Sequence, residues 1–201
     1  MTPLSSIRTL LKAGTPASAP VTIGGWLKTR RDSKAGFSFL TINDGSCQAG
    51  LQVLAPRTLP NYESEILHLT TGCALRVSGT LVASPGQGQS LEMHATAVEL
   101  FGGIDDPDSY PMSAKRHTRE HLREQAHLRP RTNTFGAVFR IRHHMAIAIH
   151  TFFHHEGFMW VATPLITALD CEGAGEMFTV TAFDLDKELP RTADGHTDFA
   201  Q

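Results

Sequence analysis

Between residues 20 and 102, hydrophobic and polar positions alternate in short runs that are separated by turn-forming residues. This pattern is typical of β-strands with one face in a core and the other in solvent. It predicts five strands, at residues 20–31, 37–43, 47–55, 73–84 and 89–101. Residues 60–70 break the alternation and predict a short helix between the third and fourth strands. Five strands with a helix in this place have the order of an OB-fold, a small β-barrel.

After about Ser113 the period becomes helical. Residues 114–126 carry charged side chains at helical spacings and predict a short helix, which Pro130 separates from the next one. A longer helix is predicted from Thr134 to Glu156, because apolar residues recur every three or four positions on one face. Gly157 suits the end of this helix, since glycine tolerates a positive φ. The apolar face indicates packing rather than a ligand site.

The segment after Gly157 combines an apolar run with an acidic loop. Phe158 to Val161 predict a strand, which ends at Pro164 because proline has no N–H for a β-ladder. Residues 170–176 then bring three carboxylates together with two glycines. Such a loop suits either the binding of an ammonium group or a solvated turn.

Alternation in the barrel also predicts which side chains face outward. If Leu40 and Ile42 point into the core, Phe39 between them points out. By the same pattern Gln52 and Glu92 point out from the third and fifth strands. On this face of an OB-fold, aromatic rings stack on unpaired bases, and a glutamine amide can read a base edge. The alternative is that Phe39 packs against a neighbouring domain.

Composition and charge limit the kinds of function that the chain can have. The net charge of −2 argues against a protein that coats nucleic acid by bulk charge. Residues 115–142 nevertheless hold eight Lys or Arg against two acids. This stretch suits contact with a phosphate backbone, or equally a solvated helix face with internal ion pairs. Three dispersed cysteines and the absence of a signal-like or membrane-spanning segment near the start predict a cytoplasmic protein.

Three segments, in this order, resemble one family. They are GGWLKTRRDSKAGFSFLTINDGS (24–46), HLREQAHLRPRTNTFGAVFRIR (121–142) and TPLITALDCEGAGEMF (163–178). Together they are similar to class II aminoacyl-tRNA synthetases in the form found in asparaginyl-tRNA synthetases, whose motif 1 the third segment resembles. The sequence EGAGEMF resembles the asparaginyl rather than the aspartyl enzymes of this class.

The resemblance implies an α+β fold with three regions. Residues 1–102 are expected to form an OB-fold anticodon-binding domain, and 103–133 a helical linker. Residues 134–201 are expected to begin the antiparallel catalytic domain of a class II synthetase, with the helix and strand of motif 1. In this family motif 1 forms a homodimer interface. The residues expected there are Gly157, Phe158, Val161, Thr163 and Pro164.

The activity implied is that of an asparagine–tRNA ligase, which attaches asparagine to tRNA(Asn) with ATP through asparaginyl-adenylate. The positions matching Phe39 and Gln52 contact the central anticodon uridine in this subclass, and Glu92 matches a position in the same pocket. Glu172 matches the position that approaches the α-ammonium group of the amino acid. From their place on the first strand, Arg30 and Arg31 are expected to contact phosphates.

The family uses ATP and Mg²⁺, but its Arg-x-Glu motif and its glycine-rich segment ending in Glu-Arg are absent from these 201 residues. The chain therefore looks like the N-terminal part of a synthetase, expected to be inactive alone and to bind neither ATP nor Mg²⁺ tightly. No catalytic residue and no metal site are assigned. His150 and His154 have a spacing that suits a metal, but Thr151 stands where the metalloprotease pattern has Glu. The alternatives are a non-catalytic tRNA-binding module and an aspartate–tRNA ligase.

Overall fold

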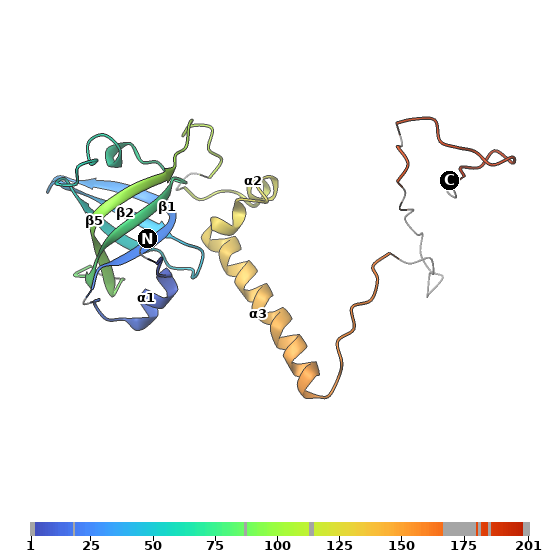
Figure 1. The fold of residues 1–201 in the computed structure, drawn as a ribbon, viewed down its shortest axis with the longest axis horizontal. Helices are drawn as coiled ribbons and strands as arrows, with labels where there is room; N and C mark the ends of the chain where they lie inside the picture. Colours follow the sequence, from blue (N-terminus) through green and yellow to red (C-terminus); the bar gives the residue numbers. More distant parts are fainter. Residues whose placement is uncertain are drawn as a thin grey trace. The chain divides into compact units, whose positions relative to one another are not determined.

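A computed structural model describes residues 3–17, 19–86, 88–112, 115–166, 180, 182–184 and 186–198. The chain divides into two compact units, Met1–Ile147 and Ala148–Gln201. The elements, shown in Figure 1, are α1 (Ile7–Ala13), β1 (Val21–Ser33), β2 (Phe37–Asn43), β3 (Leu51–Pro56), the 3₁₀ turn η1 (Ile66–His68), β4 (Ala74–Ala83), β5 (Leu91–Gly102), α2 (Arg119–Glu124), η2 (Arg129–Arg131) and α3 (Asn133–His155).

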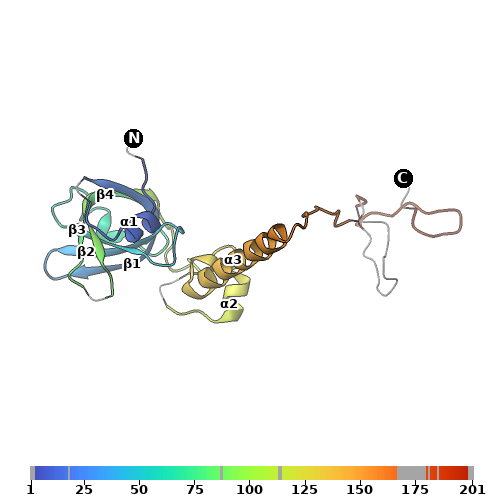
Figure 2. The same ribbon diagram turned by 90° about the horizontal axis from the view of Figure 1, so that it is seen from below.

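The five strands close into a barrel in the order β1-β2-β3-β5-β4, which Figure 2 shows from a second direction. β3 and β5 are parallel, and the other neighbouring strands are antiparallel. The five predicted strands are thus confirmed. Where a short helix was predicted at residues 60–70, the structure has turns and the 3₁₀ turn η1. β3 begins later than predicted because the loop before it is longer than a tight hairpin. There Gly45 has a φ of 79°, and the Asn43 side chain donates to the carbonyls of Cys47 and Ala49.

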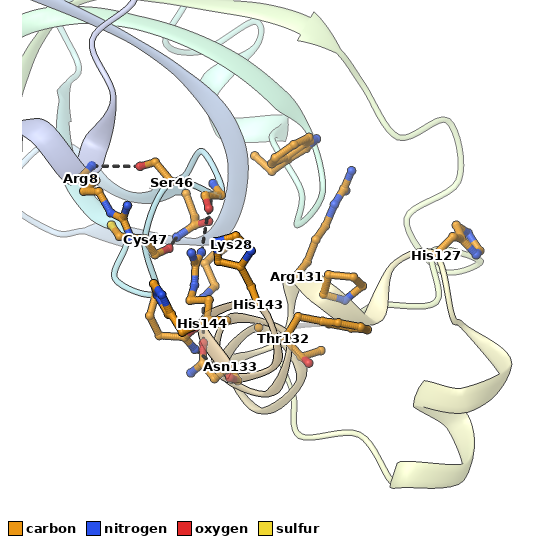
Figure 3. Close-up of a pocket in the computed structure, with 18 residues that line it drawn as sticks. Arg8, Lys28, Ser46, Cys47, His127, Arg131, Thr132, Asn133, His143 and His144 are labelled. Atoms are coloured by element: carbon orange, nitrogen blue, oxygen red, sulfur yellow. Dashed lines mark hydrogen bonds between the residues drawn. The ribbon is translucent and has the colours of Figure 1, made fainter. Parts of the chain in front are cut away.

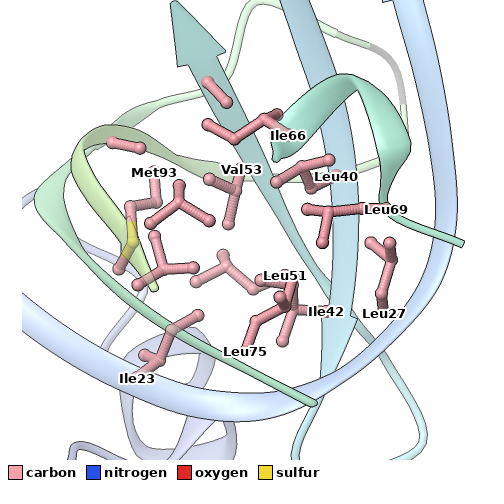
Figure 4. Packing of buried hydrophobic residues seen from close by; sticks show 14 of the residues in the cluster. Ile23, Leu27, Leu40, Ile42, Leu51, Val53, Ile66, Leu69, Leu75 and Met93 are labelled. Atoms are coloured by element: carbon pink, nitrogen blue, oxygen red, sulfur yellow. The ribbon is translucent and has the colours of Figure 1, made fainter. Parts of the chain in front are cut away.

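Alternate residues of the strands fill the barrel interior (Figure 4). On β2 the side chains of Ser38, Leu40 and Ile42 are fully buried, while those between them are partly exposed. Ile66 of η1 packs into the same core. Burying aliphatic side chains of this size stabilises a fold by roughly 1.5–3 kcal/mol each, so the alternation fixes the register of each strand. The register in turn fixes which residues line the outer wall.

The helix α1 is anchored on the loop after β2. Ser6 caps it by accepting a hydrogen bond from the Thr9 N–H, and Ile7 is buried in the core. The backbone N–H of Ile7 donates to Asp44. Burial alone would raise the pKa of Asp44, but hydrogen bonds from Ser46 and from the Ile7 N–H together hold this pKa below its usual value. The loop that follows β2 is therefore held in place by its own carboxylate.

The helix α3 matches its prediction to within one residue at each end, whereas α2 is shorter than the predicted helix at 114–126. Thr118 caps α2, and Gly157 has a φ of 83° just after α3, as predicted. The strand predicted from Phe158 to Val161 is wrong: these residues have no regular structure and are exposed. A strand needs a neighbour to take up its backbone hydrogen bonds, and no part of the chain that the structure describes pairs with this segment.

Candidate nucleic-acid interface

The outer wall of the barrel is a grid of side chains set by strand pairing. Because β2 lies between β1 and β3, and β3 pairs with β5, residues in register form rows across four strands. One row consists of Thr29, Thr41, Gln52 and Glu92. The next row consists of Arg31, Phe39, Leu54 and His94.

Phe39 and Gln52 therefore lie on one wall, on neighbouring strands and in adjacent rows. Both side chains are partly exposed, whereas Ser38 and Leu40 on either side of Phe39 are fully buried. Side chains in adjacent rows of neighbouring strands lie diagonally within reach of a long or aromatic group. One flat ligand can thus touch the Phe39 ring and the Gln52 amide together.

Phe39 has two further partners. The ring of Phe37 meets it edge-on, with centroids 5.0 Å apart. The guanidinium of Arg31 lies 5.5 Å from its centroid. A cation–π contact at an exposed site contributes about 0.5–1 kcal/mol. The pair places a positive charge beside an aromatic face, which is the combination that binds a base and its phosphate.

Arg30 does not share this surface. It pairs in register with the fully buried Leu40, so it lies on the inner side of β1. Its guanidinium donates to the carbonyl of Ile66 at 3.1 Å and forms an ion pair with Asp32 at 3.4 Å. Neighbouring residues of a strand face opposite sides, so Arg30 and Arg31 do not share one surface, and the phosphate contact expected of Arg30 stays a prediction. Arg31 remains on the outer wall.

Glu92 lies on the outer wall but is only 5% exposed, in contrast to the open position expected. Its Oε2 accepts hydrogen bonds from Gln52 Nε2 at 3.3 Å, from Ser84 Oγ at 3.1 Å and from Gln89 Nε2 at 3.5 Å. Its Oε1 lies 3.2 Å from His94 Nε2. Buried carboxylates require such partners, and here they come from three separate strands and loops.

A second surface, which the strand pattern did not reveal, is a pocket of about 610 Å³ within the first unit (Figure 3). Its lining includes side chains from the barrel, η2 and the first turns of α3, and none of the described residues that line it is acidic. The basic side chains and histidines include Arg8, Lys28, Arg131, Arg140, His143 and His144. Of the eight basic residues between positions 115 and 142, Arg131 and Arg140 line it.

Several of these cations are held in place. Lys28 donates to the Asn133 side chain at 2.9 Å, and burial lowers the pKa of Lys28. Arg140 donates to the Gly45 carbonyl at 2.7 Å. Arg131 lies 4.3 Å from the ring centroid of Trp26. A concave surface with this excess of positive charge attracts polyanions, and its walls focus the field.

The expected amino acid-binding residue, Glu172, lies outside the described residues together with the rest of its loop. Of the motif 1 positions, Phe158 and Val161 are exposed, and Thr163 and Pro164 lie in the irregular segment. Among the described residues no group of three His, Cys, Asp or Glu side chains is placed to hold a metal. None of the helices in the part of the chain that the structure describes has the length and hydropathy of a membrane span.

Two family models match the chain. Residues 21–101 match the OB-fold nucleic acid binding domain, and residues 118–189 match the tRNA synthetases of class II (D, K and N). Among curated proteins, the asparagine–tRNA ligase of Serratia proteamaculans is 59% identical over 192 residues, which are 96% of this chain and 41% of that protein. The asparagine–tRNA ligase of Yersinia enterocolitica is 58% identical over the same shares.

Solved structures agree on the fold. The asparaginyl-tRNA synthetase of Pyrococcus horikoshii complexed with asparaginyl-adenylate gives a TM-score of 0.76 at 19% identity, covering 91% of this chain and 41% of that one. The asparaginyl-tRNA synthetase of Entamoeba histolytica with asparaginyl-adenylate gives 0.66 at 21% identity, covering 84% and 39%. The chain spans about 41% of the length of the curated relatives it matches. The two matched models and the identity to these relatives thus make the chain similar to class II aminoacyl-tRNA synthetases, and within them to the asparaginyl-tRNA synthetases.

Proposed function

We propose that this chain carries anticodon recognition for an asparagine–tRNA ligase, which joins asparagine to tRNA(Asn) at the expense of ATP. The observation that carries the proposal is the outer wall of the barrel, where Phe39 lies diagonally beside Gln52 on neighbouring strands. An OB-fold uses this face for single-stranded nucleic acid. The curated relatives, at 58–59% identity over nearly the whole chain, favour asparagine over aspartate as the amino acid.

In the proposed complex an unpaired anticodon base stacks on Phe39. Stacking of a base on an aromatic ring contributes about 1–3 kcal/mol, more than the roughly 0.5–1 kcal/mol of an exposed cation–π contact. The base therefore displaces Arg31 from the ring, and the freed guanidinium lies close enough to contact the adjoining phosphate. Gln52 supplies its amide oxygen as an acceptor and one N–H donor for the edge of the same base, because its other N–H donates to Glu92.

The basic pocket supports contact with a second part of the RNA. Its lining includes the basic side chains of Lys28, Arg131 and Arg140. None of the described residues that line it carries a carboxylate. Contacts of this kind bind phosphates without reading sequence, and they weaken as salt rises. We assign to this pocket the positioning of the tRNA backbone rather than the choice of tRNA.

The ligase reaction itself has two steps, which require the binding of asparagine, ATP and the 3′ end of the tRNA. The carboxylate of asparagine attacks the α-phosphate of ATP, and the 3′-hydroxyl of the tRNA then attacks the resulting adenylate. Within these residues we assign one role in it, the binding of the α-ammonium group by Glu172 through a charge-assisted hydrogen bond. Because the Arg-x-Glu and Glu-Arg motifs are absent from the 201 residues, we propose that this polypeptide alone does not form the adenylate.

The experiment that tests the proposed function is a binding titration with the isolated anticodon stem–loop of tRNA(Asn). We expect saturable binding by the chain, because the barrel wall contacts the bases of the anticodon loop and needs no other part of the tRNA. Gln52 reads a base edge, so we expect the matching loop to bind more tightly. The matched control RNA has the same stem and a loop of unrelated sequence. Equal affinity for the two RNAs would contradict the assignment of this wall to anticodon recognition.

The apolar face of α3 supports a homodimer. It repeats at spacings of three and four residues and is exposed along its length: Val138, Ile141, Met145, Ala148 and Phe152. Apolar surfaces of this extent on a water-soluble protein mark interfaces. We propose that two copies bury this face together with Phe158 and Val161.

The dimer is tested by replacing Ile141 with lysine. A charge at the centre of a buried apolar interface costs several kcal/mol unless it is paired, so we expect the dimer to dissociate. Sedimentation equilibrium gives the masses. His150→Lys, on the opposite side of α3, is the control and is expected to remain dimeric. A monomeric parent chain, or a dimeric Ile141→Lys variant, would contradict the proposal.

A further inference from the structure

Lys28 lies at a β-bulge of β1. Leu27 pairs with Ile42 and Thr29 pairs with Thr41, so Lys28 is an extra residue between two successive pairs of the β1–β2 ladder. A bulge frees one residue from the ladder and turns its side chain away from the regular alternation. Leu27 is buried in the core, and the Thr29 hydroxyl donates to Thr41 at 3.0 Å. The side chain of Lys28 instead lines the basic pocket (Figure 3).

The amine of Lys28 has an unusual environment for a lysine. Its Nζ donates to the side-chain oxygen of Asn133 at 2.9 Å, and none of the described residues that line the pocket is acidic. Its partner is therefore a neutral oxygen rather than a carboxylate that would stabilise the charge. Burial lowers the pKa of this amine. A larger fraction of Lys28 is thus unprotonated at neutral pH than of a fully solvated lysine, and only the unprotonated amine is a nucleophile.

The rest of the pocket suits a phosphate group. Arg8 of α1, Arg131 of η2 and Arg140 of α3 line it. The first turn of α3 also contributes to the lining, through Asn133 and Gly136. The N-terminal end of a helix carries a partial positive charge that favours anions. A volume of about 610 Å³ leaves room for a small anionic molecule beside the amine. The pocket thus combines a nucleophile with a place for a phosphate leaving group.

We propose that Lys28 is an acylation site, which takes an acyl group from a small acyl phosphate bound in the basic pocket. The unprotonated amine attacks the carbonyl carbon of the donor. A C–N bond forms and the C–O bond to the phosphate breaks, while the nitrogen gives up one proton, which the departing phosphate takes up. The surrounding cations stabilise this phosphate as it leaves. The product is a neutral amide, so the pocket loses one positive charge.

The modification is expected to weaken the binding of tRNA. This consequence rests on the proposed function, in which the pocket holds the tRNA backbone. Each contact between a lysine and a phosphate contributes to affinity and to its salt dependence, so the loss of one charge lowers both. The outer wall with Phe39 and Gln52 belongs to a different surface and keeps its role.

The test incubates the chain with acetyl phosphate and follows the acetylation of each lysine by mass spectrometry. Lys34, exposed in the turn after β1, is the internal reference. We expect Lys28 to acetylate several times faster than Lys34. At constant ionic strength, added inorganic phosphate is expected to slow the reaction of Lys28 and not that of Lys34. Acetylation of Lys28 no faster than that of Lys34, or an unchanged rate at Lys28 in phosphate, would overturn the proposal.

Asn133→Asp tests the role of the unprotonated amine. The variant keeps the size of the hydrogen-bond partner of Lys28 and turns it into a carboxylate, which favours the protonated amine. Aspartate is also favourable in the first turn of a helix, so the fold is kept. We expect Lys28 of this variant to acetylate severalfold more slowly and Lys34 to react at its parental rate. An unchanged rate at Lys28 would contradict the assignment.

Two further variants measure the consequence for RNA. Lys28→Gln removes the charge, as acylation does, and Lys28→Arg keeps it. Filter binding of tRNA(Asn) at several salt concentrations gives the affinity and the slope of its logarithm against the logarithm of salt. We expect Lys28→Gln to bind several times more weakly, with a slope smaller by about one, and Lys28→Arg to bind like the parent.

The two parts fail separately. If Lys28 acetylates as expected and Lys28→Gln binds tRNA like the parent, the acylation site stands and the assignment of the pocket to the tRNA backbone fails. If Lys28 acetylates no faster than Lys34 and Lys28→Gln binds more weakly, the acylation site is overturned and the assignment to the tRNA backbone stands.

Discussion

Replacing Phe39 with alanine is expected to weaken binding of the tRNA(Asn) anticodon stem–loop about ten- to a hundredfold, because stacking on an aromatic ring contributes about 1–3 kcal/mol. The ring lies on the outer wall and its neighbours Ser38 and Leu40 fill the core, so the barrel keeps its interior without it. The measurement is a Kd by fluorescence anisotropy, with circular dichroism to show that the variant is folded.

Phe101→Ala is the matched control for this substitution. Phe101 is also an exposed aromatic residue of a barrel strand, and it too carries a guanidinium over its ring, that of Arg76 at 4.5 Å. It stands at the far end of β5 from Glu92, outside the two rows that form the candidate interface. We expect its affinity for the stem–loop to stay within about twofold of the parent. Equal losses in both variants would assign the effect to general aromatic surface and contradict the site.

Replacing Gly79 with alanine is expected to lower the free energy of unfolding of the barrel by about 1–3 kcal/mol, the usual range for overpacking. An added Cβ would lie 2.2 Å from the carbonyl oxygen of His94, so one of the two backbones must shift. The pairing of β4 with β5 is already irregular between Ser78 and Gly79. Urea denaturation followed by circular dichroism measures the change.

Gly102→Ala tests the same strand pair without the clash, because its Cβ would meet Ala74 at an ordinary 3.8 Å. We expect its stability to remain close to that of the parent. Gly79→Ala is also expected to weaken the binding of RNA, since β5 carries Glu92 and His94 next to β3. A Gly79→Ala variant as stable as Gly102→Ala would show that the two strands are not held as closely as described.

The sequence predicted those features that depend on local periodicity. The alternation of apolar and polar residues predicted all five strands. It also predicted that Phe39 and Gln52 point outward, because successive side chains of a strand point to opposite faces. The same rule, applied to adjacent positions, also separates Arg30 from Arg31, and sequence reasoning missed this by treating them together. The proposed boundaries of the anticodon-binding domain and linker, at 102 and 133, stay predictions.

Features that depend on residues far apart in the sequence could not be predicted from local patterns. The burial of Glu92 results from the parallel pairing of β3 with β5 and from Ser84 and Gln89 in a loop, and no local pattern records these contacts. The basic pocket likewise joins Arg8 to Arg140, from opposite ends of the first unit. The run Phe158–Val161 shows the converse: its apolar character indicated a strand, but a strand exists only with a partner.

Photo-crosslinking from the anticodon tests most directly whether the central anticodon base stacks on Phe39. A tRNA(Asn) stem–loop carrying 5-iodouridine at its central anticodon position is irradiated with the chain, and the crosslinked peptide is identified by mass spectrometry. Iodouracil crosslinks efficiently to an aromatic ring on which it stacks, so we expect a single major adduct on Phe39. A major adduct on Phe101, on Trp26 or on α3 would contradict it.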